Sequence, residues 1–435
     1  QRYFGVIKLG LAGGAGAGAS VGTTPARGLM AALAQMAADL SGINRLVPEI
    51  RLGDRAAEVV ETATRERVGA AFRALELALA DAIDRTGADV EARVTNADAG
   101  GGGTDDGEVG AFLLSRFEEL RDATLAGVKE ALADTRSLLE ERPVMVASWR
   151  EEFESLVRGH AASTLDALLA GLRSAAGPAP VLLVHARLAS FMETDGVPTI
   201  ARTLDAFFPA SSPTETHRTL FAEKERAAAC ARVADGLVRA YAAAQSTRLS
   251  LMIRQSVALA RWDVANEPRD VSPVVAAVAA ALVAVETETA GILEDGGYGD
   301  VAELRAETHA APTTGIDRGV ADLFRGDACS GVSFDAAVEP TRASVLGAVT
   351  KSALKSFVEC VRGVRRFNRC GYQQTQVDAT YLDRRVRRFV SVESDVAGVV
   401  GLVGAMVSAA GERSEDPTPL DPFIVDRILT QKAGR

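Results

Sequence analysis

"VGAFLLSRFEELRDATLAGVKEAL" (Val109–Leu132) decides the fold class of this chain. Six of its larger apolar residues recur at intervals of three, four and eight positions: Val109, Leu113, Phe117, Leu120, Val128 and Leu132. Residues at these intervals lie on one face of an α-helix, which turns about every 3.6 residues. The pattern therefore predicts a long helix with one buried stripe, and Pro143 should stop it because proline breaks the backbone ladder.

The same helical period continues along most of the chain. Further apolar stripes cover residues 25–43, 53–85, 149–172 and 223–262. Thr24-Pro25, Ser272-Pro273 and Asp421-Pro422 each pair an N-cap residue with a first-turn proline, and the last two predict helices to about Glu294 and Thr430. No sustained alternation of polar and apolar residues predicts strands. We therefore expect an all-α fold made of an elongated set of helical bundles.

Length and composition suggest several domains in series, because 435 residues exceed what one core usually sustains. Breaks occur at the glycine-rich run Asp98–Glu108, at "GPAP" (Gly177–Pro180) and in the polar stretch 294–311. The predicted organisation is a flexible lead 1–24, an N-terminal bundle 25–177 with a glycine-rich insertion 98–108, a middle bundle 178–311 and a C-terminal bundle 312–435. The chain starts at Gln1 without a start methionine, and we expect a piece of a longer protein.

Bulk charge and cysteine usage narrow the function classes. The formal net charge of −10 argues against nucleic-acid binding by the whole chain. Four cysteines lie far apart without metal-ligand spacing, which predicts reduced thiols in a cytosolic protein. No uninterrupted apolar run of about 18 residues appears, so we expect no membrane-spanning segment.

Motifs that resemble enzyme signatures lack their required context. "GASVG" (Gly18–Gly22) has the letters of a hydrolase nucleophile elbow around Ser20, and "GGAGAGAS" loosely resembles a dinucleotide fingerprint. Both motifs need a strand-to-helix turn in an α/β sheet, which the pattern does not predict. The four histidines, His160, His185, His217 and His309, have no ligand-type partner three or four residues away. We therefore expect no catalytic residues, no cofactor and no metal.

One basic segment stands out as a candidate site. Between Lys351 and Val390 there are ten Lys or Arg and three Asp or Glu, a local charge of +7. A helical projection gathers Val377, Tyr381, Val386, Phe389 and Val390 on one face and spreads Arg384, Arg385, Arg387 and Arg388 over the rest. Three interpretations remain open: arginines that are solvated or paired with neighbouring carboxylates, a surface for anionic lipid or an acidic partner, and a nucleic-acid site. The last is least favoured because stacking aromatics are nearly absent.

Three stretches resemble a known family. They are "LSLMIRQSVALARWDVANEPRDVSPVV" (Leu249–Val275), "PTRASVLGAVTKSALKSFVECVRGVRRFNRCGYQQTQVDATYLDRRVRRFV" (Pro340–Val390) and "EDPTPLDPFIVDRIL" (Glu415–Leu429). All three resemble the C-terminal part of the vacuolar protein sorting subunit fifty-one (fat-free) family of the GARP and EARP vesicle-tethering complexes. The most specific element is "FNRCGYQQTQVDATYL" (Phe367–Leu382), and the resemblance covers roughly residues 249–429.

The resemblance implies a fold, a role and partners. It implies the rod of stacked helical bundles common to exocyst, COG, Dsl and GARP subunits, and a non-enzymatic tether that acts in transport from endosomes to the trans-Golgi network before SNARE-dependent fusion. The implied partners are three sister subunits, a syntaxin-type SNARE bound through an N-terminal coiled coil that precedes Gln1, a small GTPase, and peripheral contact with Golgi and endosomal membranes from the cytoplasm. A helical scaffold or lipid-binding adaptor outside vesicle traffic is the alternative.

The family motif also suggests a local structure. We expect Gly371 to end the helix that starts near Ala343 as a left-handed C-cap. Gln373, Gln374, Gln376 and Asp378 would then start a second helix, with side-chain amides near its orphan backbone groups, giving a helical hairpin.

Overall fold

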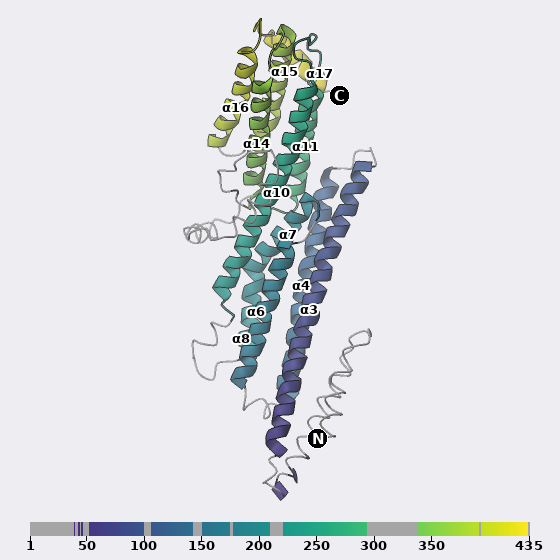
Figure 1. Cartoon of the computed structure of the whole chain (residues 1–435), viewed down its shortest axis with the longest axis vertical. Coiled ribbons are helices and arrows are strands. Elements are labelled where there is room, and N and C mark those ends of the chain that lie inside the picture. The colour runs from purple at the N-terminus through teal and green to yellow at the C-terminus, as the bar shows by residue number, and fades with distance from the viewer. Residues whose placement is uncertain are drawn as a thin grey trace. The chain divides into compact units, whose positions relative to one another are not determined.

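A computed structural model describes residues 52–99, 106–141, 150–174, 177–208, 221–293, 340–390 and 393–433, with a few single positions besides. Within these ranges the chain is helical and the β-pairing is one isolated bridge between Phe367 and Ser414. The elements are α3 (Leu52–Ala99), α4 (Asp106–Glu141), α6 (Arg150–Ser174), α7 (Ala179–Phe191), η2 (Met192–Gly196), α8 (Val197–Phe207), α10 (Glu223–Leu259), α11 (Pro273–Ala290), α14 (Arg342–Gly363), α15 (Arg369–Val386), η3 (Arg387–Phe389), α16 (Glu393–Gly411) and α17 (Pro422–Ala433) (Figure 1). The predicted all-α class is confirmed.

The chain divides into two compact units, and helices α3, α4, α6 and α10 contribute to both. One unit consists of Gln1–Ala82, Asp122–Gly171 and Gly196–Arg226, and the other of Ile83–Arg121, Leu172–Asp195 and Ala227–Arg435. This division follows contacts in space, whereas the predicted bundles 25–177, 178–311 and 312–435 follow the sequence. The three-bundle organisation stays a prediction.

The core of the first unit joins α3, α6 and α8. Phe72 of α3 stacks on His160 of α6 with ring centroids 5.6 Å apart, and Phe153 of α6 meets the ring of Phe208 edge-on at 6.1 Å. Arg158 is buried, and its guanidinium donates to Glu154 and to Asp205 of α8, each at 2.8 Å. Burial of a charge is tolerable here because both ion-pair partners are in place.

In the second unit, α16 packs closely against both α14 and α15, and α11 also contacts both (Figure 1). One face of α16 carries the buried residues Val399, Val403, Met406 and Ala410. Ser250 of α10 and Ser356 of α14 share a buried hydrogen bond of 2.7 Å. The two long helices of the predicted hairpin, α14 and α15, are therefore held largely through α11 and α16.

The sequence located most helix boundaries well. The stripe residues Leu113, Phe117, Leu120 and Leu132 are buried, as the opening pattern predicts. Helices α11 and α17 begin at Pro273 and Pro422, and Asp421 caps the latter because its Oδ1 accepts from Phe423 N at 2.9 Å. Ser272 occupies the N-cap of α11, but its side chain makes no capping bond.

Some expectations fall partly or wholly beyond the described ranges. The glycine-rich run Asp98–Glu108 was expected to be a connection, yet helix α3 extends through Ala99 and α4 begins at Asp106. The expectations for residues 1–24, for Ser20 and for the stretch 294–311 lie outside the described residues.

Helix α11 is long and apolar enough to cross a membrane by length and composition. It nevertheless carries two glutamates that bind within the unit. Glu286 pairs with Arg342 of α14 at 3.2 Å, and Glu288 accepts from Tyr241 of α10 at 2.6 Å. Its apolar residues Val275, Val278, Leu282 and Val285 are buried, so one face of α11 packs within the unit.

Candidate interaction site around helix α15

Helix α15 begins directly after an asparagine in the family-like motif Phe367–Leu382. Asn368 is the N-cap, and its Oδ1 accepts from Gly371 N at 2.7 Å. Helix α14 has already ended at Gly363, with Val364 in an extended conformation. The prediction that Gly371 is a left-handed C-cap of that helix is therefore wrong: Gly371 lies in the first turn of α15.

Close contact with a neighbouring loop explains why residue 371 is glycine. A Cβ atom at this position would lie 2.5 Å from the carbonyl oxygen of Trp262 and 3.2 Å from Asn368 Oδ1. The same Trp262 oxygen accepts from Asn368 N at 3.0 Å, and Asn368 Nδ2 donates to Ala265 O at 2.8 Å. Glycine therefore lets the loop after α10 touch the backbone of α15.

The next turns of α15 bind the end of that loop. Asp378 is buried, and its Oδ1 accepts from Ser272 N at 2.8 Å and from Gln374 Nε2 at 3.0 Å. The Gln374 amide also donates to Asp270 O at 3.0 Å. Burial raises the pKa of Asp378 to about 6, its hydrogen bonds to Ser272 and Gln374 oppose that rise, and the nearby Asp270 adds to it.

Two other glutamines on α15 hold the loop between α16 and α17. Gln373 Nε2 donates to Thr418 O at 3.2 Å. Gln376 accepts from Leu420 N at 2.9 Å through Oε1 and donates to Tyr372 Oη at 3.2 Å through Nε2. Each side-chain amide thus satisfies a backbone group that no helix or strand partner could reach.

Together these side chains form one structural element, which we call the α15 clamp. It consists of Asn368, Gly371, Gln373, Gln374, Gln376 and Asp378. The clamp ties together the three sequence stretches that carry the family resemblance, because loop 260–272 and loop 412–421 both bind α15. The glutamines and Asp378 were expected near orphan groups of their own helix, whereas they satisfy groups of distant loops. Sequence reasoning missed Asn368 and Trp262, although an Asn three residues before a Gly at a helix start is a recognisable capping signal.

Ion pairs and ring contacts engage the four arginines predicted to form a surface. Arg384 pairs with Asp426 of α17, Arg387 with Asp383 at 2.8 Å, and Arg388 with Glu286 of α11 at 3.1 Å. The Arg385 guanidinium lies over the Tyr381 ring, 5.5 Å from its centroid. The contacts of Arg384 and Arg388 hold the end of α15 against α17 and α11. The predicted partner or lipid surface at the four arginines stays a prediction.

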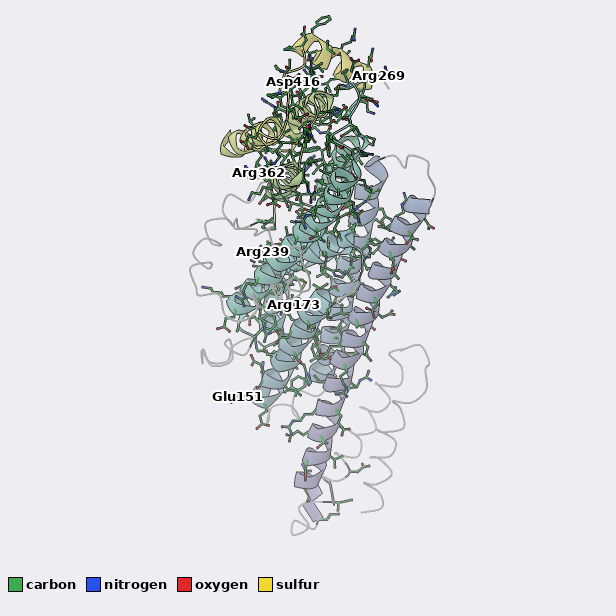
Figure 2. The ribbon with its side chains drawn as sticks, turned by 45° about the horizontal axis from the view of Figure 1, so that its top comes forward. Glu151, Arg173, Arg239, Arg269, Arg362 and Asp416 are labelled. Atoms are coloured by element: carbon green, nitrogen blue, oxygen red, sulfur yellow. The ribbon has the colours of Figure 1, made fainter. Side chains whose placement is uncertain are left out.

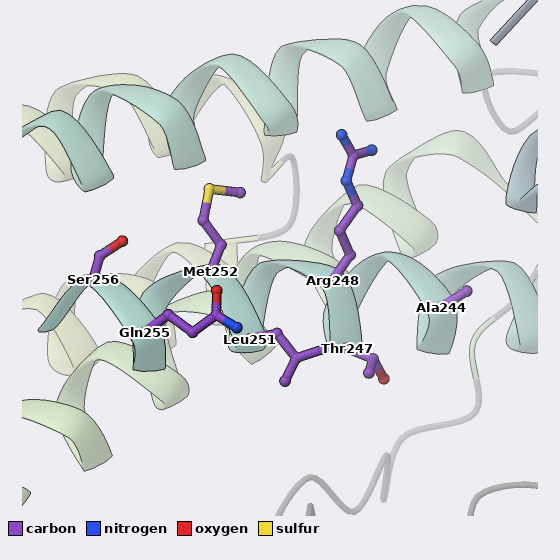
Figure 3. A pocket seen from close by; sticks show the side chains of 7 residues that line it. All are labelled: Ala244, Thr247, Arg248, Leu251, Met252, Gln255 and Ser256. Carbon is purple, nitrogen blue, oxygen red and sulfur yellow. The ribbon is translucent and has the colours of Figure 1, made fainter. Parts of the chain in front are cut away.

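A shallow hollow lies on α10 (Figure 3). It is lined from one face of that helix by Ala244, Thr247, Arg248, Leu251, Met252, Gln255 and Ser256. Arg248 is its one charged side chain, so the hollow brings together no acid and base pair. On the neighbouring helix α11, burial raises the pKa of Glu288, which accepts from Tyr241 and Gln245 of α10.

The histidines that the structure describes are single core or edge residues. His160 stacks on Phe72, and burial is the largest cause of its lowered pKa. His185 is fully buried, and neither ring nitrogen makes a hydrogen bond of good geometry among the described residues. Burial lowers the pKa of His185 to about 4, and the Leu172 backbone opposes this shift. Among the described residues no three His, Cys, Asp or Glu side chains gather as a metal site.

Comparison with curated proteins extends the resemblance seen in the sequence. Eight match, all named vacuolar protein sorting-associated protein 51 homolog. The Bos taurus protein is 28% identical over 98% of this chain and 55% of its own length, and the Arabidopsis thaliana protein 25% identical over 92% and 55%. The Drosophila melanogaster protein is 28% identical over 59% of this chain and 37% of its own length. The chain therefore spans about half the length of the first two. No family model and no solved structure matches.

Proposed function

We propose, on the premise that this chain belongs with the vacuolar protein sorting-associated protein 51 homologs, that it serves as a subunit of a vesicle-tethering complex. The finer form of the proposal is a non-enzymatic GARP- or EARP-type subunit that acts from the cytoplasm in retrograde transport from endosomes to the trans-Golgi network. Its companions would be three sister subunits, with a syntaxin-type SNARE and a small GTPase as further partners. Similarity along nearly the whole chain supports this placement.

The observation that carries the proposal is that the family-like residues bind loops of this chain. The side-chain amides and the carboxylate of the α15 clamp form hydrogen bonds to loops 260–272 and 412–421. In an enzyme we would expect the most distinctive motif to present reactive groups to a substrate. Here the motif shapes one end of a helical bundle, which suits a protein that acts through surfaces and reach.

Affinity purification of the tagged full-length protein tests the proposal. We expect three helical companion subunits in stoichiometric amounts. A Gly371→Ala variant, which is designed to displace the loop after α10, should recover fewer companions if that end contacts them, and Gly363→Ala is the matched control because it replaces an open helical glycine. Purification of the wild type alone, or with a stable set of unrelated proteins, would favour a scaffold outside vesicle traffic.

Covalent labelling tests the absence of catalysis separately. A fluorophosphonate probe should leave the wild-type protein unlabelled. Labelling that disappears in a Ser20→Ala variant would instead establish a serine nucleophile and contradict the non-enzymatic role.

A further inference from the structure

A second group of arginines lies at the other end of helix α15 from the four predicted ones. Between Lys355 and Arg369 the chain carries five basic residues and one acidic residue, Glu359, a local charge of +4. Arg366 pairs with Glu415. Arg362, Arg365 and Arg369 are exposed and make no ion pair or hydrogen bond within the described part of the chain. We call these three residues the arginine corner.

Helix stability does not account for the corner. Arg362 lies in the last turn of α14, where a cation is favourable, but Arg369 is the first residue of α15, where the helix dipole opposes a cation. Three uncompensated positive charges within eight residues also repel one another. An arrangement that is electrostatically costly and exposed is typical of a surface that awaits an anionic ligand.

The backbone under the corner is fixed before any ligand binds. Phe367, between Arg365 and Arg369, is fully buried against Trp262, with ring centroids 5.4 Å apart. Its N–H donates to Arg413 O at 3.0 Å, and its carbonyl accepts from Glu415 N at 3.4 Å. The clamp residue Asn368 holds the other side through Trp262 and Ala265. Because the turn is pinned on both sides, binding would cost little backbone entropy.

The corner continues along α14. Lys355 and Arg362 are seven residues apart and therefore share one face of the helix, and Lys355 also has no ion pair among the described residues. Figure 2 shows Arg362 on the outside of the C-terminal helices. The result is a short basic track from α14 across the turn to the start of α15.

From this geometry we infer that the arginine corner binds an acidic segment of a partner protein. Guanidinium groups on a rigid turn suit carboxylates, which they bind through paired hydrogen bonds. A flat anionic membrane fits less well, because it would also face the acidic residues around the corner. Glu359 lies on α14 between Lys355 and Arg362, and Glu412 and Asp416 are exposed on the adjoining loop. This inference goes beyond the tethering role and does not depend on it.

Fluorescence anisotropy with the purified full chain tests the inference. The probe is a labelled oligoglutamate of about ten residues, at about 50 mM and about 200 mM salt. Substitution of Arg362, Arg365 and Arg369 together by Gln should weaken binding about tenfold or more, and higher salt should weaken wild-type binding. The control replaces Arg384, Arg387 and Arg388 by Gln. It removes the same charge from side chains that are already paired and should change affinity less than about twofold.

Two further measurements test whether unfolding of the triple variant or binding to a membrane could explain the result. Arg365→Gln alone, in the turn, should still weaken binding several-fold, so the test holds even if the triple variant unfolds. Vesicles of phosphatidylcholine with roughly 30% phosphatidylserine should bind more weakly than the peptide. Absence of oligoglutamate binding by the wild type, equal losses in the corner and control variants, or vesicle binding without peptide binding would each overturn the inference.

Discussion

Substitution of Gly371 by Ala tests how the clamp holds the loop after α10. The added Cβ would lie 2.5 Å from Trp262 O, a backbone atom that cannot rotate away. Relief of such overpacking typically costs about 1–3 kcal/mol. If the loop moves, the bonds of Asn368 to Trp262 O and Ala265 O are also at risk, at about 1 kcal/mol each. Alanine recovers about 1 kcal/mol of helix propensity over glycine. We therefore expect a net destabilisation of about 2 kcal/mol or more.

Urea unfolding followed by Trp262 fluorescence measures this effect. The chain has two tryptophans, Trp149 and Trp262, so a Trp149→Phe background makes the signal local to the clamp. The midpoint should fall at an unchanged slope with denaturant. Gly363→Ala is the control: no atom lies within 4 Å of its added Cβ, and it should be neutral or stabilising by up to about 1 kcal/mol.

A second substitution at the same position separates close contact from backbone strain. Asparagine tolerates the left-handed conformation that our sequence-based prediction assigned to Gly371. With the contact described here, Gly371→Asn should be at least as destabilising as Gly371→Ala. If Gly371→Ala matched Gly363→Ala in stability, or if Asn restored what Ala lost, the explanation by close approach to Trp262 would be refuted.

Three further predictions concern buried groups and a close helix contact. The pKa of Asp378 is raised from 3.8 to about 6, so the folded state binds this proton more tightly than the unfolded state does. The contribution of Asp378 to stability should therefore grow by about 3 kcal/mol as the pH falls from above 6 towards 4. Asp378→Asn should remove this pH dependence from urea midpoints measured across that range. The pH dependence due to His185 runs the other way: its pKa is lowered from 6.5 to about 4, so stability is lost as the pH falls between those values. His185→Leu should abolish this loss and raise the melting temperature at pH 7. A lower melting temperature would show that the imidazole has a hydrogen-bond partner. A Cβ on Gly291 would lie 2.5 Å from the carbonyl oxygen of Gly110, so Gly291→Ala should destabilise by about 1–3 kcal/mol in thermal unfolding. Gly236→Ala, with open space around its added Cβ, should stabilise by up to about 1 kcal/mol, and equal effects of the two would contradict the contact.

The two pH effects overlap and oppose each other. Between pH 6 and pH 4, protonation of Asp378 favours the folded state. His185 favours the unfolded state in the same range, because its imidazole binds a proton more readily there. The wild-type protein should therefore show a flatter pH profile than either single variant. Each substitution exposes the contribution of the other residue, which makes the pair a stricter test than one variant alone.

The sequence by itself determined most of the helices and indicated which proteins the chain is similar to. The stripe from Leu113 to Leu132 predicted a buried helix face because helical periodicity is a local property of the chain. Ser272-Pro273 and Asp421-Pro422 located two helix starts for the same reason. The motif Phe367–Leu382 indicated which proteins the chain resembles, but it did not show what its residues contact.

Only the tertiary structure decided what those residues contact. Gly371 looks the same in sequence whether it is needed for a left-handed backbone or for an approaching carbonyl, and that carbonyl belongs to Trp262, more than a hundred positions earlier. The sequence left open whether Arg384 and Arg388 are paired, and the structure supplies Asp426 and Glu286 as their partners, whereas Arg362, Arg365 and Arg369 near the turn have no ion pair among the described residues. Local patterns fix which face of a helix is apolar, but ion pairs and close contacts depend on atoms that only folding brings together.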